Sequence, residues 1–265
     1  MRVALGIEYD GAAFSGFQYQ NHAPSVQRSL QEALSSVAAA PITIHAAGRT
    51  DAGVHATGQV VAFDTPVERP LSAWIHGTNA LSPDGVAVVW AREVPADFHP
   101  RYQATARRYM YLFYDTELVS PLLRGRAVLS RPLDDAAMHR AAQSLLGEQD
   151  FSAFRAAGCQ SSTPMRCVHQ TTVLRSGGFV VIDVTANAFL LHMMRNIAGA
   201  LWRIGLGERP HGWIETLLIG RDRNLAAPTA PPGGLYLVDV RYPDLMLPSG
   251  RPPPLLRALG DLGRF

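Results

Sequence analysis

Apolar residues recur along this chain with two periods, about two residues and about 3.6 residues, which are typical of strands and of helices. In the first half these periods predict the order β-α-β-β-α-β. The expected elements are a strand over 3–9, a helix over 26–37, strands over 42–46 and 59–63, a helix over 71–80 and a strand over 86–94. Ser25 directly precedes the first helical repeat, so it is the expected N-cap of that helix.

The second half shows a comparable alternation of strands and helices. Its expected elements are a strand over 107–114, a helix over 135–146, strands over 168–174 and 179–185, helices over 189–204 and 213–219, and a final strand over 235–242. Asp134 is the expected cap of the helix that begins at residue 135, and Gly147 the residue that stops it. Two similar ferredoxin-like α/β units are therefore predicted.

These patterns predict an α+β fold in which two ferredoxin-like halves, with mainly antiparallel sheets, join around a central catalytic cleft. The N-terminal half spans 1–104 and carries the Gly48–Ala56 turn, and the C-terminal half spans 105–247. Residues 248–265 are rich in proline at their start and are predicted to form an extended tail.

Composition narrows the class of protein. With 265 residues, of which 47% are hydrophobic, the chain is long enough to bury a stable core. Glu8 and Asp10 interrupt the region where a signal peptide needs apolar residues, and no run of 18 apolar residues occurs. A soluble, cytoplasmic protein is expected. Cys159 and Cys167 are expected to be reduced thiols, and the histidines show no HExxH spacing, so no metal is predicted.

The basic residues are unusual in kind more than in number. The net charge is only +2, but the chain has no lysine, so all 24 basic residues are arginines. Several are clustered, at 107–108, at 124, 126 and 131, and at 221 and 223. Arginine bridges phosphate oxygens and stacks on bases, which suits RNA, although a GC-rich genome also replaces lysine with arginine. Only the clustering therefore favours an RNA partner.

One turn concentrates candidate chemistry. The segment Gly48–Ala56, GRTDAGVHA, places Asp51 between two glycines and two residues after Arg49, and it connects two expected strands. Asp-plus-Gly turns between strands are common, and Asp51 is also a candidate for a simple turn that bonds its own backbone. The combination of acid, cation and flexible backbone favours a reactive loop.

This turn and three other segments resemble the TruA-type tRNA pseudouridine synthases. GRTDAGVHA resembles the signature loop of that family, and the resemblance extends in family order from residue 3 to about 243. The further matching segments are 7–27 with its IEYDG and SVQ motifs, 98–111 with FHPR and ATARRYMY, 187–199 (NAFLLHMMRNIAG) and 234–237 (GLYL).

The resemblance implies an enzyme that isomerises uridine to pseudouridine at positions 38, 39 and 40 of the tRNA anticodon stem-loop, acting as a homodimer without a cofactor. It implies that Asp51 is the catalytic acid, that Tyr109 is the active-site tyrosine, and that Arg195 pairs with the acid. Asp51 has several possible roles, as a nucleophile at C1′ or as a base and partner to a glycal or oxocarbenium-like species. The sequence does not choose between these routes.

Other residues are expected to bind the substrate. Arg49 is assigned to the flipped nucleotide or the RNA backbone, and Tyr109 to stacking on the detached uracil, because the target base must leave the helix to react. Phosphate contacts are assigned to Arg101, Arg107, Arg108 and Arg124. An apolar wall of the pocket is assigned to Leu235 or Leu237, and Tyr111 is assigned to the core.

Two alternatives remain. A noncatalytic RNA-binding module on the same fold would keep the arginine clusters and lose the acid or its partner, whereas Asp51, Tyr109 and Arg195 are all present. A hydrolase that releases the base would normally need a second acid for the leaving group, and no convincing paired carboxylate accompanies Asp51.

Overall fold

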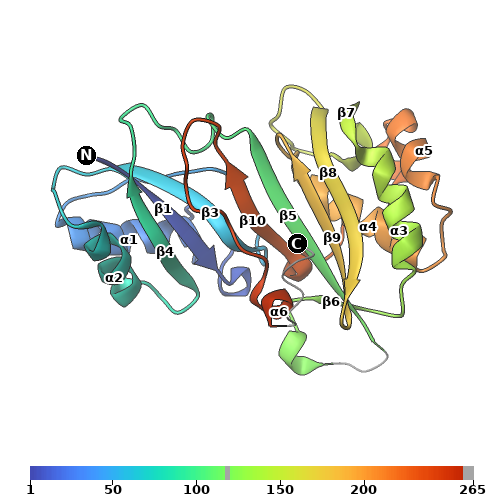
Figure 1. Ribbon diagram of the computed structural model, residues 1–265, viewed down its shortest axis with the longest axis horizontal. Helices are drawn as coiled ribbons and strands as arrows, with labels where there is room; N and C mark the ends of the chain where they lie inside the picture. Colours follow the sequence, from blue (N-terminus) through green and yellow to red (C-terminus); the bar gives the residue numbers. More distant parts are fainter. Residues whose placement is uncertain (117–119, 259–265) are drawn as a thin grey trace. The chain divides into compact units, whose positions relative to one another are not determined.

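The chain is a mixed α/β protein whose strands pair mainly antiparallel, and it divides into two compact units (Figure 1). The computed structural model describes residues 1–116 and 120–258. Unit 1 comprises Met1–Thr105 and Tyr236–Arg251. Unit 2 comprises the described residues of Ala106–Leu235 and those after Arg251.

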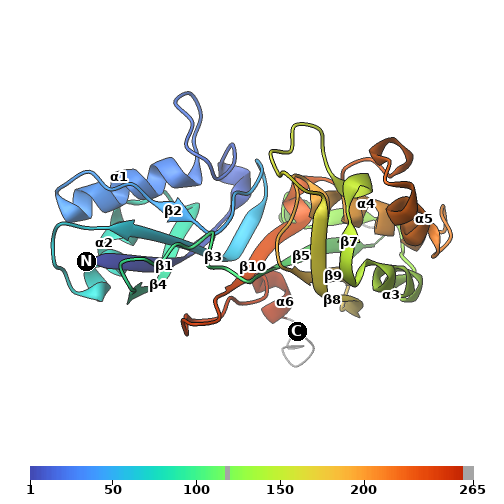
Figure 2. The same cartoon turned by 90° about the horizontal axis from the view of Figure 1, so that it is seen from above.

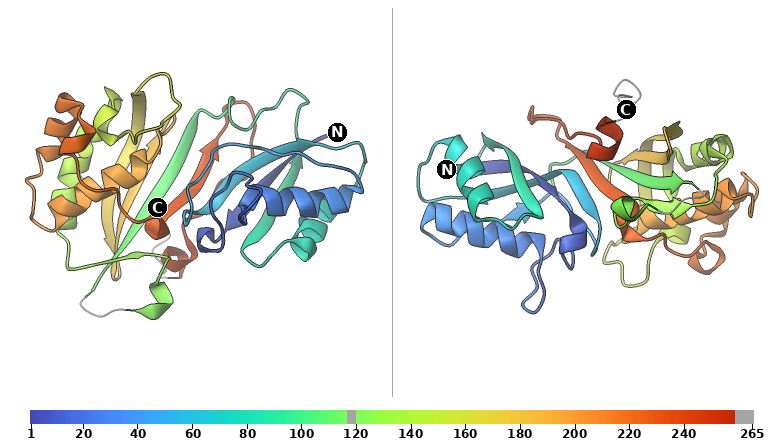
Figure 3. Two further views of the ribbon diagram at one scale, coloured as in Figure 1. Left: turned by 180° about the vertical axis from the view of Figure 1, so that it is seen from behind. Right: turned by 90° about the horizontal axis from the view of Figure 1, so that it is seen from below.

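Unit 1 is a sheet with the strand order β4-β1-β3-β10 and a short strand, β2, beside β3. Its elements are β1 (Arg2–Tyr9), α1 (Val26–Ala38), β2 (His45–Ala46), β3 (His55–Asp64), α2 (Leu71–Leu81), β4 (Val86–Glu93) and β10 (Leu235–Arg241). β1 is antiparallel to both β3 and β4, whereas β10 is parallel to β3. Helices α1 and α2 pack against each other on one face of this sheet (Figure 3).

Unit 2 has the strand order β5-β9-β8-β7, with β6 parallel to β5. Its elements are β5 (Ala106–Asp115), β6 (Val128–Ser130), α3 (Asp135–Ala142), β7 (Gly147–Asp150), β8 (Met165–Ser176), β9 (Phe179–Ala186), α4 (Met193–Gly205), α5 (Trp213–Gly220) and α6 (Pro254–Arg257). Helix α3 contacts β8, α4 and α5 (Figure 2). Every residue of β9 is buried, as expected for a central strand.

Each predicted strand and helix is found with the predicted type, but several boundaries are wrong, and β6, β7 and α6 were not predicted. β2 covers only two residues of the strand predicted over 42–46, and β3 begins at His55 instead of 59. Helix α3 ends at Ala142 and continues as a 3-10 turn over Gln143–Leu145, with Gly147 already in β7 at φ +86°. The cap by Asp134 is confirmed, because its carboxylate accepts a hydrogen bond from the Ala137 amide at 2.8 Å.

The predicted start of the helix at 189 is also wrong, since α4 begins at Met193. His192 lies in the left-handed region at φ 58°, so the chain turns sharply before the helix. The backbone of Leu191 is already engaged: its amide donates to the Cys159 sulfur at 3.4 Å and its carbonyl accepts from Ala156 at 3.0 Å. These long-range bonds replace the first helical turn that periodicity predicts.

Ser25 stands at the N-cap position of α1, but its hydroxyl makes no capping bond. The helix amides are satisfied from another segment, because Val26 N donates to the Gly16 carbonyl at 3.3 Å and Gln27 N to the Phe17 carbonyl at 2.9 Å. The main chain of Gly16–Phe17 therefore replaces the predicted side-chain cap.

The C-terminal part of the chain differs from the predicted division. Residues 236–247 belong to unit 1, where Leu237 pairs with Ala56, although they were assigned to the C-terminal half. The prediction of an extended tail over 248–265 is wrong for part of it: Thr57 Oγ1 donates to the Arg251 carbonyl, and Leu256 in α6 is fully buried. Residues 259–265 lie outside the described residues.

Three features of the described residues bear on the expected chemistry. Within residues 1–116 and 120–258, no helix combines the length and apolar character needed to cross a bilayer. Over the same residues no group of three or more His, Cys, Asp or Glu side chains is arranged to hold a metal ion. Cys159 and Cys167 are both free thiols, as predicted.

Candidate active site

The loop that carries Asp51 connects β2 to β3 within unit 1. Asp51 is half-buried, Arg49 is exposed, and Thr50 between them is buried. A main-chain bond from Val54 N to the Asp51 carbonyl, 3.1 Å, closes the turn. Gly53 adopts φ +78°, a conformation that favours glycine, so the flexible position predicted from sequence is required here.

Thr50 anchors this loop to the rest of unit 1. Its hydroxyl bonds the Tyr9 hydroxyl at 2.8 Å, and its carbonyl accepts from Phe17 N at 3.0 Å. Since the Phe17 carbonyl also accepts from Gln27 N, the start of α1 is linked through one residue to the loop. Gln59 Nε2 donates to the Gly48 carbonyl at 2.9 Å, which secures the other side. Thr50, the residue before Asp51, is thus held by Tyr9 of β1 and by Phe17, which also bonds the first turn of α1.

Close backbone packing holds the end of the same loop. A Cβ on Gly11 would lie 2.1 Å from the Val54 carbonyl oxygen, so only glycine allows this approach. The Gly11 amide donates to His55 Nδ1 at 3.1 Å, and the His55 ring stacks on Tyr236 with centroids 4.7 Å apart. The loop therefore has little freedom to move Asp51, which is the preorganisation that a catalytic carboxylate needs.

Tyr109 lies on β5 in unit 2. It is 9% exposed, and its ring meets Phe189 edge to face with centroids 4.8 Å apart. An aromatic ring held in this way offers a fixed surface on which a base can stack. Phe189 belongs to the segment before α4 that sequence periodicity had placed inside a helix.

Tyr111, two residues further along β5, is a core residue as predicted. It has no exposed surface, and its hydroxyl donates to the Pro231 carbonyl at 2.7 Å. Burial raises the pKa of Tyr111 far above its ordinary value, and the nearby positive charge of Arg195 opposes that shift only partly. This hydroxyl therefore stays protonated.

Arg195 lies in the first turn of α4 and is half-buried. Its Nε donates to the Ala230 carbonyl at 2.8 Å, while the Ala230 amide donates back to the Arg195 carbonyl at 3.2 Å. Further along the helix, a Cβ on Gly199 would lie 2.3 Å from the Pro228 carbonyl oxygen, so glycine at this position permits a close approach. Segment 228–230 is thus packed directly on the face of α4 that carries Arg195.

Arg107 and Arg108 have different environments, although both were assigned to phosphates. Arg107 donates to the Asn187 carbonyl at 2.9 Å. Arg108 instead forms a two-pronged ion pair with Asp183, with Nε to Oδ1 at 2.9 Å and Nη2 to Oδ2 at 2.5 Å. Since both partners are mostly buried, this pair belongs to the packing of β5 on β9, and the structure favours a structural role for Arg108.

Replacing Arg108 with methionine is expected to destabilise the protein by roughly 3 kcal/mol, because Asp183 would remain as a buried charge without this partner. Chemical denaturation measures the loss, and tRNA affinity is expected to stay within about twofold. Arg101→Met is the comparison, because Arg101 is exposed and its guanidinium lies over the Tyr102 ring. A larger loss of affinity with Arg108→Met than with Arg101→Met would restore Arg108 to the RNA-binding residues.

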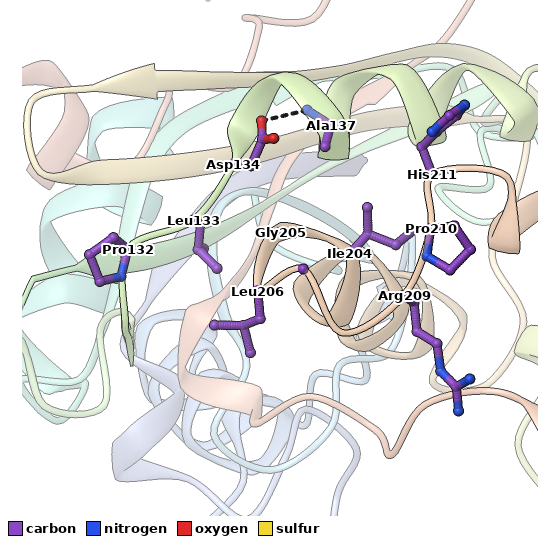
Figure 4. Close-up of a pocket in the computed structure, with 11 residues that line it drawn as sticks. Pro132, Leu133, Asp134, Ala137, Ile204, Gly205, Leu206, Arg209, Pro210 and His211 are labelled. Atoms are coloured by element: carbon purple, nitrogen blue, oxygen red, sulfur yellow. Dashed lines mark hydrogen bonds between the residues drawn. The ribbon is translucent and has the colours of Figure 1, made fainter.

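Leu237 lies on β10 opposite Ala56 and has no exposed surface. It therefore supports the strand that follows the Asp51 loop. In unit 2 a cavity of about 600 Å³ opens at the other end of α4, between Leu133, Ile204 and Arg209 (Figure 4). Arg195 is ten positions before Gly205, about 15 Å along the helix at its ordinary rise, so this cavity is separate from the candidate residues.

The residues that support the candidates were not predicted from the sequence. Tyr9, Gln59 and Phe17 fix the Asp51 loop, and Asn196 and Arg223 fix the neighbourhood of Arg195. The sequence feature that could have identified them is a polar or aromatic residue inside an apolar strand, as for Tyr9 and Gln59. Such a residue indicates a buried hydrogen bond but does not identify the partner.

Comparison with known proteins agrees with these features. Residues 6–103 and 141–243 match a family model described as tRNA pseudouridine synthase. The chain therefore belongs to the tRNA pseudouridine synthase family, whose members are isomerases that convert uridine to pseudouridine in tRNA.

Curated relatives narrow the comparison within that family. A protein of Shewanella frigidimarina named tRNA pseudouridine synthase A is 56% identical over 245 residues, which is 92% of this chain and 94% of the relative. A protein of Actinobacillus pleuropneumoniae serotype 7 with the same name has the same identity and coverage. A relative of that name in Shewanella halifaxensis is 55% identical over 245 residues, with the same coverage of both chains. The sequence-based assignment to this family is confirmed.

Proposed function

We propose that this chain isomerises uridine to pseudouridine at positions 38, 39 and 40 of the tRNA anticodon stem-loop. It does so in the cytoplasm, as a homodimer and without a cofactor. The observation that carries the proposal is the Asp51 loop, where a half-buried acid follows a residue fixed by bonds to Tyr9 and Phe17. Such a loop is built to present a carboxylate in one place.

The proposed reaction uses one residue of unit 1 and two of unit 2. Asp51 attacks or stabilises C1′ when the N-glycosidic bond breaks. The detached uracil stacks on Tyr109 while it turns, and the Tyr109 hydroxyl assists removal of the C5 proton after C5 joins the sugar. Arg195 pairs with the Asp51 carboxylate. We further propose that the units are two ferredoxin-like halves around a catalytic cleft, as the resemblance implies.

The residues proposed to bind the substrate are chosen by the exposure of their side chains. Arg49, which is exposed beside Asp51, and Arg101, which is exposed in unit 1, are proposed to contact the nucleotide or the RNA backbone, together with Arg107. Since Leu237 is fully buried, it is proposed to support the pocket wall from behind. Several neighbouring targets suit recognition by shape, because the bases are presented on one stem-loop.

The site assignment is tested with tRNA transcripts that retain uridine at only one of positions 38, 39 and 40. Pseudouridine is mapped by carbodiimide modification and primer extension after incubation with the purified protein. We expect a stop at each of the three positions and none in the T-arm or D-arm. Modification confined to another arm would contradict the proposed target, although the chain would remain a pseudouridine synthase.

A further inference from the structure

A second layer of residues surrounds Arg195, and it comes from one segment of unit 2. We call residues 223–231 the brace. Its 3-10 turn, Arg223–Leu225, begins after Asp222, whose carboxylate accepts from the Asn224 amide at 2.8 Å. The rest of the brace runs along α4, where Ala230 and Arg195 exchange two hydrogen bonds.

Asn196 connects the brace to the helix at the residue next to Arg195. It has no exposed surface, and its Nδ2 donates to the Phe154 carbonyl at 2.8 Å. Its Oδ1 accepts from Thr229 Oγ1 at 2.6 Å and from Arg223 Nη2 at 3.1 Å. The buried amide is thus bonded at both ends, a condition in which loss of one partner leaves a costly unsatisfied group.

Arg223 ties both ends of the brace together. Besides Asn196, its Nη2 donates to Thr229 Oγ1 at 3.1 Å, and its Nη1 donates to the Ala227 carbonyl at 2.8 Å. The position of Thr229 in turn sets the position of Ala230, whose carbonyl accepts from Arg195 Nε. Because the N–H groups of arginine form a rigid fork, a bond at Nε constrains the direction of the whole guanidinium.

The brace also reaches the strand that carries Tyr109. The Pro231 carbonyl accepts from the Tyr111 hydroxyl at 2.7 Å, and Tyr111 is two positions after Tyr109 on the same face of β5. One continuous stretch therefore bonds to α4 beside Arg195 and to β5 beside Tyr109.

We propose that Arg223 and Thr229 are positioning residues for the isomerisation, which they support by fixing the Ala230 carbonyl and so the direction of the Arg195 guanidinium. The inference rests on the role proposed for Arg195 in catalysis. It differs from the interpretation that clustering with Arg221 suggests, in which Arg223 binds RNA phosphates. Since Arg223 makes three hydrogen bonds to groups within unit 2, its charge serves the fold of the brace.

The test compares Arg223→Met with Arg140→Met, which removes the same charge from an exposed position on α3. Single-turnover pseudouridine formation at saturating tRNA and tRNA affinity at several salt concentrations are measured for both. A misplacement of about 1 Å costs roughly 100-fold in rate, so Arg223→Met is expected to lose between tenfold and 100-fold. Its tRNA affinity and salt slope are expected to match those of Arg140→Met, which keeps the wild-type rate.

Thr229 supplies a milder variant in case Arg223→Met does not fold. Thr229→Val removes the hydroxyl with little change of shape, and Thr229→Ser keeps it. Thr229→Val removes both hydrogen bonds of this hydroxyl, the one to Asn196 and the one from Arg223. We expect a rate loss of about tenfold for Thr229→Val, and recovery to within twofold of wild type for Thr229→Ser.

A purely structural role is separated from positioning by a double-mutant cycle. In an Arg195→Lys background no guanidinium remains to be directed, so Thr229→Val is expected to reduce the rate by less than twofold. An equal loss in both backgrounds, or a reduced salt slope with an unchanged saturating rate, would overturn the inference. Wild-type protein without any pseudouridine formation would instead refute the proposed function, so the two failures are distinct.

Discussion

Asp51→Asn is expected to reduce pseudouridine formation by about 10⁴-fold, the scale seen when an enzyme loses its reacting group. The loss corresponds to about 5.4 kcal/mol of transition-state stabilisation. Asparagine keeps the size of the side chain and the main-chain bond from Val54 to residue 51, so the loop is expected to remain in place. The substitution removes the negative charge on which the proposed reaction depends. Single-turnover assays at saturating tRNA measure the effect.

The control for Asp51→Asn is binding. Filter binding with the same tRNA is expected to give an affinity within about threefold of wild type, because the carboxylate is not proposed to contact phosphates. A variant that retains more than a tenth of the wild-type rate would remove Asp51 from the reaction. A variant that fails to bind tRNA would place it in recognition instead.

Gly11→Ala is expected to disrupt the loop from outside, with a loss of roughly 3 kcal/mol in the free energy of unfolding and roughly 100-fold in rate. The new Cβ would lie 2.1 Å from the Val54 carbonyl oxygen, a main-chain atom that cannot rotate away. Either β1 or the end of the Asp51 loop must shift. Urea denaturation gives the stability and single-turnover assays give the rate.

Gly220→Ala is the matched control, because a Cβ at the end of α5 meets no atom within 4 Å among the described residues. It is expected to change stability by less than about 0.5 kcal/mol and to leave the rate unchanged. Equal stability of Gly11→Ala and wild type would show that the close approach of Gly11 to Val54 does not occur in solution.

Local patterns in the sequence were sufficient to predict most elements. The alternation that predicts a strand over 107–114 is found in β5, and the helical stripe over 26–37 is found in α1. In both elements the spacing of apolar residues over a short segment is enough to predict whether the segment is a strand or a helix. Asp134 belongs to the same class, because its partner, Ala137, is three residues away.

The errors have long-range causes. β3 extends back to His55 because it pairs in parallel with Tyr236 in β10, 181 residues later in the chain, and no local pattern reports such a partner. In the same way, Cys159 and Ala156 bind the backbone of Leu191, which delays the start of α4. Ser25 is a residue type that commonly caps helices, but the first amides of α1 donate to the main-chain carbonyls of Gly16 and Phe17 instead.

In the candidate site, too, features set by neighbouring residues were predictable and features set by distant partners were not. The turn around Asp51 was recognisable because its glycines and acid are contiguous, and Gly53 indeed adopts a positive φ. For the arginines, residue type was not sufficient. In the sequence Arg108 and Arg223 look as available for RNA as Arg101 does, yet partly buried hydrogen bonds to Asp183 and Asn196 engage the first two. Partner and burial, which the sequence does not state, decide between a structural and a binding arginine.

The most direct test of the central claim is the fate of the C5 hydrogen and of the base. tRNA carrying [5-³H]uridine is incubated with wild-type protein and with Asp51→Asn, and tritium in water, free uracil and pseudouridine are quantified together. We predict that wild-type protein releases one tritium for each pseudouridine formed, with no free uracil, and that Asp51→Asn releases none. Release of free uracil would indicate a hydrolase, and tight binding of intact substrate without tritium release would indicate an RNA-binding protein; either result would contradict the account.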